Sequence, residues 1–532
     1  MANIIVYGGG FAGVAAAAKA ASKAPNHEVI LISPYPDDML GGIGTSGGQN
    51  YWDTIEWPRG SLTARGSFAF WYDTYPKYYG VAEMSKLLKT ESLGKYNNIS
   101  VYTGYDISGF RTTGSPYRIT SVDVKRIYRD ADGYIKWGVS SLTFDGAVFI
   151  DASEEARLAR CVNTSATYGR YDWPAAMLES AEQNRNYTAR QQAATLMFKM
   201  KGISAASSGD MNYSQSAKGV WGCWGGASNY KNPNGRVAAF NNAHGPSGYM
   251  IKPVNAAQDG TNSPHWWINA FLVFNVDGRA HSRDEGSSFY PSSMLAGTKS
   301  TDRAWVDARR FLHANRAQFE GAMRSYPGFG AASLVYSDGL PEVGSVLYIR
   351  ETVHMAKDSA GRMNGTEDRN YAVGATASLS AGDAPGRGAD AANYASRIGL
   401  AMYNADVHPY RYTDLMKNGA YLWGSESWEK MRPDRPVTNP ERPQYPVYMP
   451  YACLTTGYVA NLLIPGYGAG VSSYSWGEVR VFPNLCVLGD AAGIAAAYSV
   501  NSGVQALDIG WSATHVKAVQ NDLAAAGARL EK

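Results

Sequence analysis

The residues whose types and spacing most clearly indicate chemistry are Gly8-Gly9-Gly10-Phe11-Ala12-Gly13. They follow an apolar run, Asn3–Tyr7, typical of a buried parallel strand, and they precede an alanine-rich run that favours a helix. In this context the Gly-x-Gly-x-x-Gly spacing predicts a dinucleotide-binding turn. Gly8 would make the tight turn, Gly10 would let the backbone approach a pyrophosphate, and Gly13 would let helix and sheet pack closely. Phe11 and Ala12 lie within this turn and are expected to contact the cofactor, and the helix expected from Val14 onward directs its positive end at the phosphates.

A ribose-binding residue is expected about twenty residues after this turn, where the next strand, Glu28–Ile32, ends. The usual residue there is a carboxylate, but this chain has Ser33. We expect the Ser33 hydroxyl to bind the ribose, a weaker hydrogen-bonding partner than a carboxylate, with Asp37 or Asp38 as alternatives.

A second glycine-rich stretch begins with Gly41-Gly42 and includes Thr45. One interpretation is a flexible surface loop. The other is backbone that passes close to the ring of the cofactor, where larger side chains would clash. We favour the second interpretation because the stretch lies shortly after the second expected strand.

The C-terminal part of the chain repeats the pattern of an apolar run, a glycine and an alanine-rich run, beginning at Asn484. The pattern predicts a strand at 484–488, a turn at Gly489-Asp490 and a helix, with a purely structural turn as the alternative. We expect Asp490 to bind the ribityl hydroxyls of a flavin and the helix N-terminus to point at the cofactor. Two such motifs, one near each end of the chain, predict FAD. The residues expected to contact FAD here are Gly489, Asp490, Gly493 and Ile494.

With these motifs the chain resembles the FAD-dependent oxidoreductases of the glutathione-reductase-like superfamily. The resemblance implies an α/β fold with a Rossmann-like FAD-binding domain, in which a parallel sheet and helices form three layers, and a mixed α+β substrate or cap domain. It departs from the family where Ser153-Glu154 replace a Thr-Gly pair and where His354 replaces an arginine. Further segments that carry it are Val148–Ser153, Ala194–Met200, Tyr326–Phe329, Tyr348–Thr352, Asn461–Gly466 and Arg480-Val481.

The family resemblance also implies a discontinuous FAD-binding domain. We assign 1–50, 97–160 and 450–525 to it, with Ile107 near the adenine and Ala152 at a strand end beside the cofactor. The remaining residues, 51–96 and 161–449, would form the substrate or cap domain. Within it we expect a strand over 195–199, a helix over 303–323, loops over 204–300 and an extended proline-rich connector over 431–450.

The expected reaction is the transfer of a hydride from a small organic substrate to flavin N5 by a dehydrogenase or oxidase. His354 is the candidate base, although a structural histidine is the alternative. Arg350 and Arg480 are expected to bind an anionic substrate or the reduced flavin, or else to form a buried ion pair between domains. Tryptophans at 221, 224, 266 and 267 could bind an aromatic or sugar-like ring, although this is not the favoured interpretation. A flavin monooxygenase and a non-catalytic FAD protein remain alternative functions.

The composition narrows the remaining possibilities. A net charge of +3 over 532 residues gives no reason to expect nucleic acid as a partner. Four cysteines form no Cys-x-x-Cys pair, no His/Cys spacing indicates a metal, and no apolar run is long enough to span a membrane. No second dinucleotide motif indicates an NAD(P)H domain, so we expect oxygen, a quinone or another acceptor to reoxidise the flavin. The early first strand predicts a cytoplasmic protein, with an exported protein that has lost its leader as the alternative.

Overall fold

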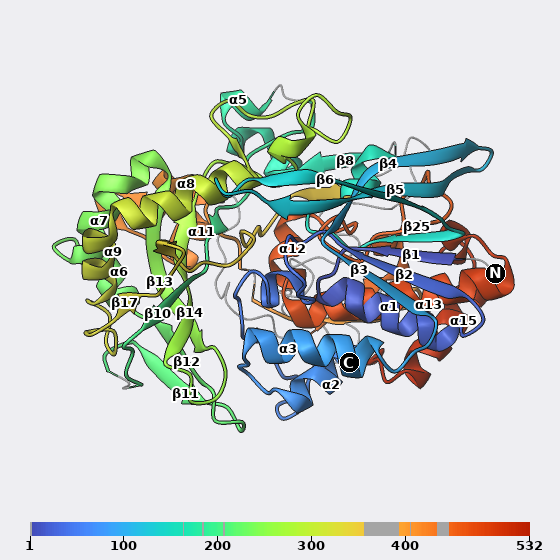
Figure 1. Ribbon diagram of the computed structural model, residues 1–532, viewed down its shortest axis with the longest axis horizontal. Helices are drawn as coiled ribbons and strands as arrows, with labels where there is room; N and C mark the ends of the chain where they lie inside the picture. Colours follow the sequence, from blue (N-terminus) through green and yellow to red (C-terminus); the bar gives the residue numbers. More distant parts are fainter. Residues whose placement is uncertain are drawn as a thin grey trace.

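The computed structural model describes residues 3–162, 164–183, 186–205, 208–355, 393–404, 406–433 and 446–532. Most of the expected connector over 431–450 therefore lies outside the described residues. The chain folds into an α/β structure that contains a parallel sheet and a separate antiparallel sheet, shown at the right and left of Figure 1. This confirms the predicted fold class.

The parallel sheet has five strands in the order β25-β7-β1-β2-β3. The strands are β1 (Asn3–Tyr7), β2 (Glu28–Ser33), β3 (Ile99–Thr103), β7 (Val148–Asp151) and β25 (Leu462–Leu463). Helices α1 (Phe11–Lys23) and α13 (Phe482–Ser502) cover one face, and the antiparallel strands β4 (Tyr105–Gly114), β5 (Tyr117–Arg129) and β6 (Ile135–Asp145) cover the other (Figure 1). The parallel sheet and its helices agree with the expectation from the family resemblance, whereas the third layer is an antiparallel sheet and not the expected helices.

Alternating side chains of the parallel strands build two cores. In β1, Ile4 and Val6 pack with the helical layer, while Ile5 and Tyr7 pack with the layer of β4 and β5. Successive side chains of a strand point to opposite faces, so a strand that is covered on both sides must be apolar throughout. This is why Asn3–Tyr7 shows no polar alternation.

The structure contradicts the predicted strand and turn in the C-terminal motif. Residues 482–502 form one uninterrupted helix, α13, with Pro483 in its first turn and Gly503 at its C-terminal cap. A short apolar run cannot be distinguished from a buried helix by periodicity, and almost all of α13 is buried. Its small residues bring it against α1, because a Cβ at Gly489 or Gly493 would lie 2.2 Å from the carbonyl oxygen of Ala12 or Ala16.

The second sheet has seven strands, six of them in the order β11-β12-β13-β14-β10-β17, with β9 paired to β14. The expectation of loops over 204–300 is therefore wrong. The central strands are buried on both faces and show neither the alternation of a half-buried strand nor a continuous aliphatic run. Their bounds are β9 (Ala194–Thr195), β10 (Phe198–Lys201), β11 (Asn212–Gln215), β12 (Trp221–Gly225), β13 (Tyr249–Gln258), β14 (His265–Val273) and β17 (Ser333–Leu334).

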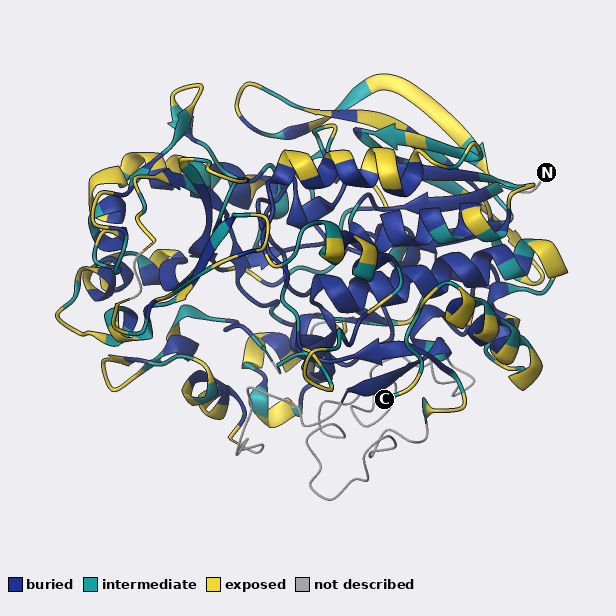
Figure 2. Ribbon diagram, turned by 90° about the horizontal axis from the view of Figure 1, so that it is seen from below, coloured by how far each residue is buried: buried dark blue, intermediate teal, exposed yellow. Residues whose placement is uncertain are grey.

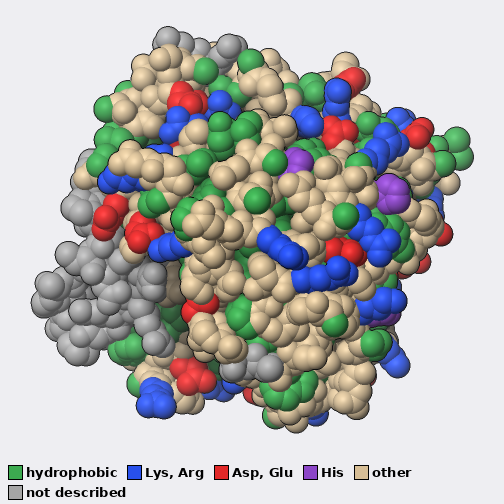
Figure 3. All heavy atoms as spheres, turned by 90° about the vertical axis from the view of Figure 1, so that its left-hand side faces the viewer, with side chains coloured by type: hydrophobic (Ala, Val, Ile, Leu, Met, Phe, Trp, Pro, Cys, Tyr) green, Lys and Arg blue, Asp and Glu red, His purple; other side chains and the backbone are tan. Residues whose placement is uncertain are grey.

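Helices cover the second sheet. They are α6 (Ala227–Lys231), α7 (Arg236–His244), α8 (Thr301–Ala314) and α9 (Arg316–Met323). The helix expected over 303–323 is thus two helices separated at Asn315, and the strand expected over 195–199 is divided between β9 and β10. On the face shown in Figure 3, Lys and Arg side chains are interspersed with Asp and Glu.

Shorter elements connect the two sheets. Helices α2 (Ser67–Thr74) and α3 (Val81–Leu87) contribute Phe68, Trp71 and Met84 to the core of α1 and α13. Two pairs of short strands also lie between the sheets in the sequence: β20 (Val353–Met355) pairs with β8 (Ala166–Tyr168), and β21 (Arg397–Ala401) pairs with β24 (Val447–Pro450).

The division of the chain into domains stays a prediction.

Burial follows this architecture, because the interior strands and helices are covered while exposed residues lie on outer helix faces, on loops and on parts of β4 and β6 (Figure 2). Two further helices lie near the C-terminal part, α12 (Ser473–Val479) and α15 (Ala513–Ala525). No helix in the described part of the chain is long and apolar enough to cross a membrane.

Candidate functional site

The first glycine turn lies at the carboxyl edge of the parallel sheet, between β1 and α1. Gly8 has a φ of 112°, a conformation that favours glycine, and a Cβ there would lie 2.5 Å from the backbone of Ala152. A Cβ at Gly13 would lie 1.7 Å from the carbonyl oxygen of Gly8. Gly10 is the N-cap of α1, and no side chain caps the helix there. An uncapped helix N-terminus at a sheet edge is suited to bind a pyrophosphate.

The second glycine-rich stretch packs against the first. The Gly41 N–H donates to the carbonyl oxygen of Gly9 over 2.8 Å, and Gly41 has a φ of 112°. The buried Thr45 hydroxyl donates to the carbonyl oxygen of Leu40 over 2.8 Å and so closes the loop from inside. The structure therefore brings the two glycine stretches together, which is necessary if both are to contact the same cofactor.

Ser33 ends β2 beside the same turn. Its side chain is buried, and its hydroxyl has no hydrogen-bond partner among the described residues. A Cβ at Gly9 would lie 2.1 Å from the Ser33 Oγ, so the serine is in contact with the turn. A buried hydroxyl without a partner calls for an explanation, and the hydroxyl of a bound ribose would supply the missing partner.

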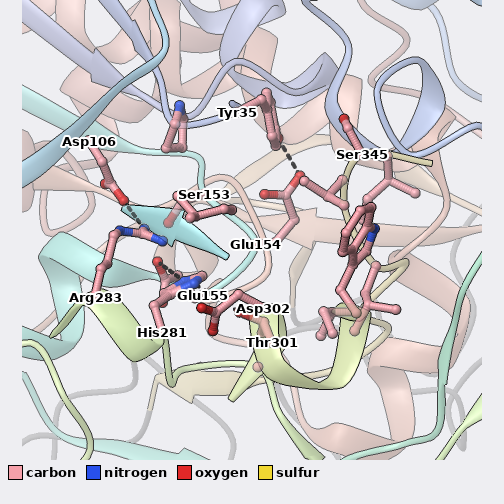
Figure 4. Close-up of a pocket in the computed structure, with 18 of the residues that line it drawn as sticks. Tyr35, Asp106, Ser153, Glu154, Glu155, His281, Arg283, Thr301, Asp302 and Ser345 are labelled. Carbon is pink, nitrogen blue, oxygen red and sulfur yellow. Dashed lines mark hydrogen bonds and ion pairs between the residues drawn. The ribbon is translucent and has the colours of Figure 1, made fainter. Parts of the chain in front are cut away.

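A pocket opens beside this edge of the sheet (Figure 4). Its lining includes Tyr7 and Ile43, next to the two glycine stretches, and segments from the second half of the chain. The Tyr35 hydroxyl donates to Glu154 at its wall, and His281 Nε2 lies 3.0 Å from Glu155 Oε1. Burial raises the pKa of Glu154 to about 7. The wall of this pocket thus carries a carboxyl group that changes charge near neutral pH.

The Tyr35 and Glu154 pair lies over both glycine stretches. A Cβ at Gly42 would lie 2.4 Å from the Tyr35 hydroxyl, and a Cβ at Gly10 would lie 3.3 Å from it. The turn, the uncapped helix and the unpartnered Ser33 hydroxyl fit a dinucleotide. Glu154, which stands where a glycine is expected, adds a group that repels phosphate when it is ionised.

A second group of buried polar side chains lies between the two sheets. We call it the interdomain cluster; its members are Asp53, Lys252, Asn269, Arg350, Asp406, His408 and Arg480, all but Asp53 and Asp406 largely inaccessible. Arg480 donates to the Tyr348 hydroxyl and to Asp406 Oδ2, each over 2.6 Å. The two arginines predicted to act on the substrate, Arg350 and Arg480, are therefore in one place.

Arg350 is held by neutral acceptors. Its Nη1 and Nη2 donate to the Ala193 carbonyl oxygen and to Thr195 Oγ1, each over 2.8 Å, while Nε has no partner among the described residues. No carboxylate of the described residues forms an ion pair with it. Burial lowers the pKa of Arg350 from its ordinary value. The alternative of a buried ion pair therefore fits Arg480 and not Arg350.

Lys252 projects from β13 into the same cluster. Its Nζ donates to the carbonyl oxygens of Asn269 and Pro253 over 2.9 and 3.2 Å. Burial, together with the nearby positive charge of Arg350, lowers the pKa of Lys252 to about 7. Burial raises the pKa of Asp53 to about 6. The sequence analysis predicts a role for neither Lys252 nor Asp53. The one feature that could have indicated Lys252 is a lysine within an otherwise apolar strand.

Several buried polar atoms of this region lack partners in the described part of the chain. They are Arg350 Nε, His408 Nδ1, Asn269 Oδ1 and Tyr467 OH. Buried polar atoms in folded proteins are nearly always hydrogen-bonded, so their concentration here indicates a site that binds a polar ligand.

A surface pocket of about 200 Å³ leads to the interdomain cluster. Tyr403, Asp406, His408 and Trp423 are among its walls. The Lys252 Nζ lies 5.8 Å from the centre of the Trp423 ring. Burial and the positive charge of Arg350 lower the pKa of His408 to about 3, so this imidazole is neutral and close to Arg350. The pocket therefore shares Asp406 and His408 with the interdomain cluster.

His354, the predicted base, lies in a separate buried pair on β20. Its Nε2 is 3.2 Å from Glu351 Oε1, and its Nδ1 has no partner among the described residues. The Tyr410 hydroxyl donates to the same Glu351 oxygen over 3.4 Å. Burial raises the pKa of Glu351. The role of His354 as a base stays a prediction.

The residues of the C-terminal motif lie inside α13 and not at a turn. Asp490 accepts hydrogen bonds from the backbone N–H and the hydroxyl of Ser67, over 2.8 and 2.5 Å, at the start of α2. Gly489 and Gly493 face α1, and Ile494 is buried in the same core. The strand–turn context on which the ribityl role of Asp490 was based is absent, because the helix continues through it.

Two other predicted contacts lie near the sheet edge. Ile107 is buried in β4 under the parallel sheet, and its carbonyl oxygen accepts from Arg157 Nε over 3.0 Å. Ala152 directly follows β7 and touches Gly8 through its backbone. Both positions are compatible with a neighbouring cofactor, and their roles stay predictions.

Known proteins provide a comparison for this architecture. No curated protein sequence matches the chain. Among solved structures it is similar to the myxobacterial chondrochloren halogenase CndH, a variant of FAD-dependent halogenases, with 13% identity, coverage of 51% of this chain and 53% of that chain, and a TM-score of 0.26. It is also similar to p-nitrophenol 4-monooxygenase PnpA from Pseudomonas putida DLL-E4, with 11% identity, coverage of 64% and 68%, and a TM-score of 0.28.

The flavin-dependent halogenase CmlS is a third similar structure, with 14% identity, coverage of 69% of this chain and 52% of that chain, and a TM-score of 0.30. The chain thus spans about half of the length of each halogenase. Similarity this distant carries no argument about activity. The family model described as FAD dependent oxidoreductase, in contrast, matches residues 3–523. The protein therefore belongs to the family of FAD-dependent oxidoreductases, is an enzyme and takes FAD as its cofactor.

Proposed function

We propose that the protein is a dehydrogenase or oxidase that removes a hydride from a small organic substrate at the interdomain cluster. Two groups of residues support this proposal. The glycine stretches and Ser33 provide an edge where a dinucleotide can bind, and the interdomain cluster provides buried groups that can hold a substrate and move a proton. When bound, FAD supplies a two-electron acceptor for this chemistry.

The residues proposed to hold FAD are those at the carboxyl edge of the parallel sheet. The Gly8–Gly13 turn and the N-terminus of α1 would bind the pyrophosphate, and the Ser33 hydroxyl would bind the ribose. Gly41 and Gly42 would leave space for the backbone to approach the cofactor. We do not assign the ribityl group to Asp490, because Ser67 already donates two hydrogen bonds to its carboxylate.

The observation that carries the proposal is the environment of Lys252. Its amine is buried and, among the described residues, donates to backbone carbonyl oxygens alone, and its pKa is lowered to about 7. A neutral amine at physiological pH can accept the proton of a substrate O–H or N–H group while the hydride leaves the neighbouring carbon. His354 instead lies against Glu351, so we prefer Lys252 as the base.

The pH dependence of flavin reduction tests this assignment. Because Lys252 acts in its neutral form, the rate of anaerobic flavin reduction by a substrate should rise as the pH increases through about 7. Lys252→Met should lower that rate by roughly 10²- to 10⁴-fold and remove this rise. The measurement is the bleaching of flavin absorbance in a stopped-flow instrument, with a panel of small alcohols, amines and acids as donors.

His354→Gln is the matched control, and it should keep both the rate and its pH dependence. A large loss in this control together with full activity of Lys252→Met would contradict the assignment. Bleaching only with NAD(P)H would instead indicate a monooxygenase, and no bleaching with any donor would indicate a non-catalytic FAD protein.

A further inference from the structure

A cavity of about 1100 Å³ lies apart from the sites described above, with walls from α4 (Arg157–Cys161), from β8 at the top of Figure 1, and from the segments 186–188 and 286–293. Among the described residues, none that lines it also lines the pocket beside the carboxyl edge of the parallel sheet or belongs to the interdomain cluster. We call it the tyrosine pocket, because Tyr168, Tyr171, Tyr187 and Tyr290 line it. Sites for small molecules are roughly 300–1,000 Å³, so this pocket has room for a ligand larger than one small substrate.

The rings of the tyrosine pocket remain accessible to a ligand. Tyr187 is 63% exposed, and its ring packs edge-on against Tyr171 with the centroids 5.4 Å apart. The other three tyrosines are half-buried, and the guanidinium carbon of Arg279 lies 4.1 Å from the centre of the Tyr168 ring. Aromatic faces are apolar and carry partial negative charge, which suits them to the C–H groups of a sugar ring.

Hydroxyl groups make up most of the polar lining between the tyrosines. Five serines and three threonines line the pocket, and the side chains of Ser287, Ser288 and Ser292 are exposed. A hydroxyl both donates and accepts hydrogen bonds, as do the hydroxyls of a sugar. Tyrosine combined with serine is also a composition by which binding surfaces join rigid contact area to adaptable hydrogen bonds. These walls are therefore suited to a ligand that is rich in hydroxyl groups.

The cations on the walls of the tyrosine pocket are already paired. Arg279 donates to Asp277 with Nε and Nη2 over 2.9 and 2.6 Å, and Arg160 Nη2 lies 3.3 Å from Glu155 Oε2. The carboxylate of Asp172 accepts from a backbone N–H over 2.9 Å. Each cation in the described part of the walls thus has a carboxylate partner, so the pocket does not require an anionic ligand.

One buried donor on the wall lacks an acceptor. The side chain of Arg160 is 6% exposed, and its Nη1 donates to the carbonyl oxygen of Phe289 over 2.7 Å. Its Nε has no partner among the described residues. A buried N–H group without a partner costs free energy, and nearly all such groups in folded proteins are hydrogen-bonded. A neutral hydroxyl oxygen of a ligand can accept from this Nε and leave the ion pair with Glu155 intact.

We propose that the tyrosine pocket binds a neutral oligosaccharide, with its sugar rings against the tyrosines and its hydroxyls bonded to the serines and to Arg160 Nε. A peptide fits the walls less well, because a bound peptide commonly adds a strand to a free sheet edge. The strand β8 offers no such edge at Tyr168, which already pairs with Val353 of β20 and with Thr188. This inference is independent of the proposed function, since it involves no redox step.

Calorimetric titration of the FAD-loaded protein tests the proposal. The probes are maltotetraose, cellotetraose and tetra-N-acetylchitotetraose, each compared with its own monosaccharide, together with anionic tetragalacturonate and an end-blocked tetra-alanine peptide. We expect at least one neutral tetrasaccharide to bind about tenfold or more tightly than its monosaccharide, because a wide pocket contacts several rings. Its affinity should not change between low and high salt, since a neutral ligand forms no ion pair. Binding of no neutral tetrasaccharide, or tighter binding of the galacturonate or the peptide, would overturn the proposal.

Tyr187→Ala should lower the affinity for that tetrasaccharide by about tenfold, because the exposed ring contacts the ligand. Tyr128→Ala is the matched control, since Tyr128 on β5 is 49% exposed and does not line the pocket, and it should keep the wild-type affinity. Both changes are made at exposed side chains, so both variants should fold. An undiminished affinity in Tyr187→Ala would overturn the proposal.

Alkylation of Cys161 shows where the tetrasaccharide binds. Cys161 lines the tyrosine pocket and is partly accessible, whereas Cys223, Cys453 and Cys486 are buried. A bound tetrasaccharide should slow the reaction of Cys161 with N-ethylmaleimide, measured by mass spectrometry of the labelled peptide, and the monosaccharide at the same concentration should protect it less. An unchanged labelling rate at a saturating concentration of the tetrasaccharide would show that it binds elsewhere and would overturn the proposal.

Discussion

Single residues determine how well a phosphate binds at the carboxyl edge of the parallel sheet, which we call the cofactor edge. Most of this edge is glycine backbone and the uncapped N-terminus of α1, both of which favour negative charge. Glu154 opposes this preference, because its carboxyl group lies beside Gly10 and Gly42. Tyr35 donates to that carboxyl group, and burial keeps its pKa near 7. The charge of Glu154 therefore changes with pH near neutrality, because burial raises the pKa of its carboxyl group.

FAD affinity should consequently depend on pH. The pKa of Glu154 is raised, so the carboxyl is mostly protonated below pH 7 and becomes an anion above it, where it repels the pyrophosphate. Between pH 6 and 8.5 the affinity should fall by roughly tenfold. Glu154→Gln should bind FAD with high affinity throughout this range. Titration of apoprotein with FAD, followed by quenching of flavin fluorescence, measures the effect, and an equally steep pH dependence in both proteins would refute it.

At the scale of elements, the contact between α1 and α13 is the clearest example of sequence chemistry that determines packing. Alanines on α1 and two glycines on α13 allow the helix backbones to approach closely. In the sequence, the same small residues predicted a turn. In the structure they instead allow α13 to pack closely against α1, and only the presence of this buried neighbouring helix distinguishes packing from a turn.

Gly489→Ala tests this packing. The added methyl group would lie 2.2 Å from the Ala12 carbonyl oxygen, so the helices must separate. We expect a loss of about 1–3 kcal/mol in the free energy of unfolding, despite the higher helix propensity of alanine. Gly321→Ala in α9 is the matched control, since its Cβ would meet only an arginine side-chain atom at 3.9 Å. That variant should gain up to about 1 kcal/mol. Urea unfolding measures both, and a stabilised Gly489→Ala would contradict the packing argument.

The elements also show which parts of the structure the sequence could predict. Asn3–Tyr7, the glycine turn and α1 were predictable because strand pattern, turn residues and helix propensity agree locally. Strands β13 and β14 were not, since burial on both faces removes the alternation that marks a strand. Arg350 and Arg480 were found through family motifs, whereas Lys252 acquires its environment only when two distant segments of the chain pack together.

At the scale of the whole molecule, the cofactor edge and the interdomain cluster are built by segments from both ends and the middle of the chain. Lys252 comes from the antiparallel sheet, while Arg480 precedes α13 of the other layer. A ligand that contacts groups from both parts stabilises their assembly, because binding to the folded state alone shifts the unfolding equilibrium. FAD should therefore raise the stability of the entire protein.

Gly10→Val separates this effect from the intrinsic stability of the fold. Gly10 has a φ of −71°, which any residue adopts, and its Cβ would lie 3.3 Å from the nearest atom, the hydroxyl of Tyr35. The variant should therefore fold with nearly wild-type stability in the absence of FAD. At 100 times the dissociation constant, FAD should add about 2.7 kcal/mol to the stability of the wild type. It should add nothing to Gly10→Val, because the valine side chain occupies the approach to the α1 N-terminus.

Gly8→Ala provides the contrasting control, since the positive φ of Gly8 and its contact with Ala152 should make that variant unstable even without FAD. Thermal unfolding with and without FAD distinguishes the three proteins. Equal stabilisation of the wild type and Gly10→Val by FAD would show that the pyrophosphate binds elsewhere. A Gly10→Val protein that is unstable without FAD would show that this glycine serves the fold. The expected pattern, a normal apoprotein that no longer responds to FAD, would assign Gly10 to the cofactor alone.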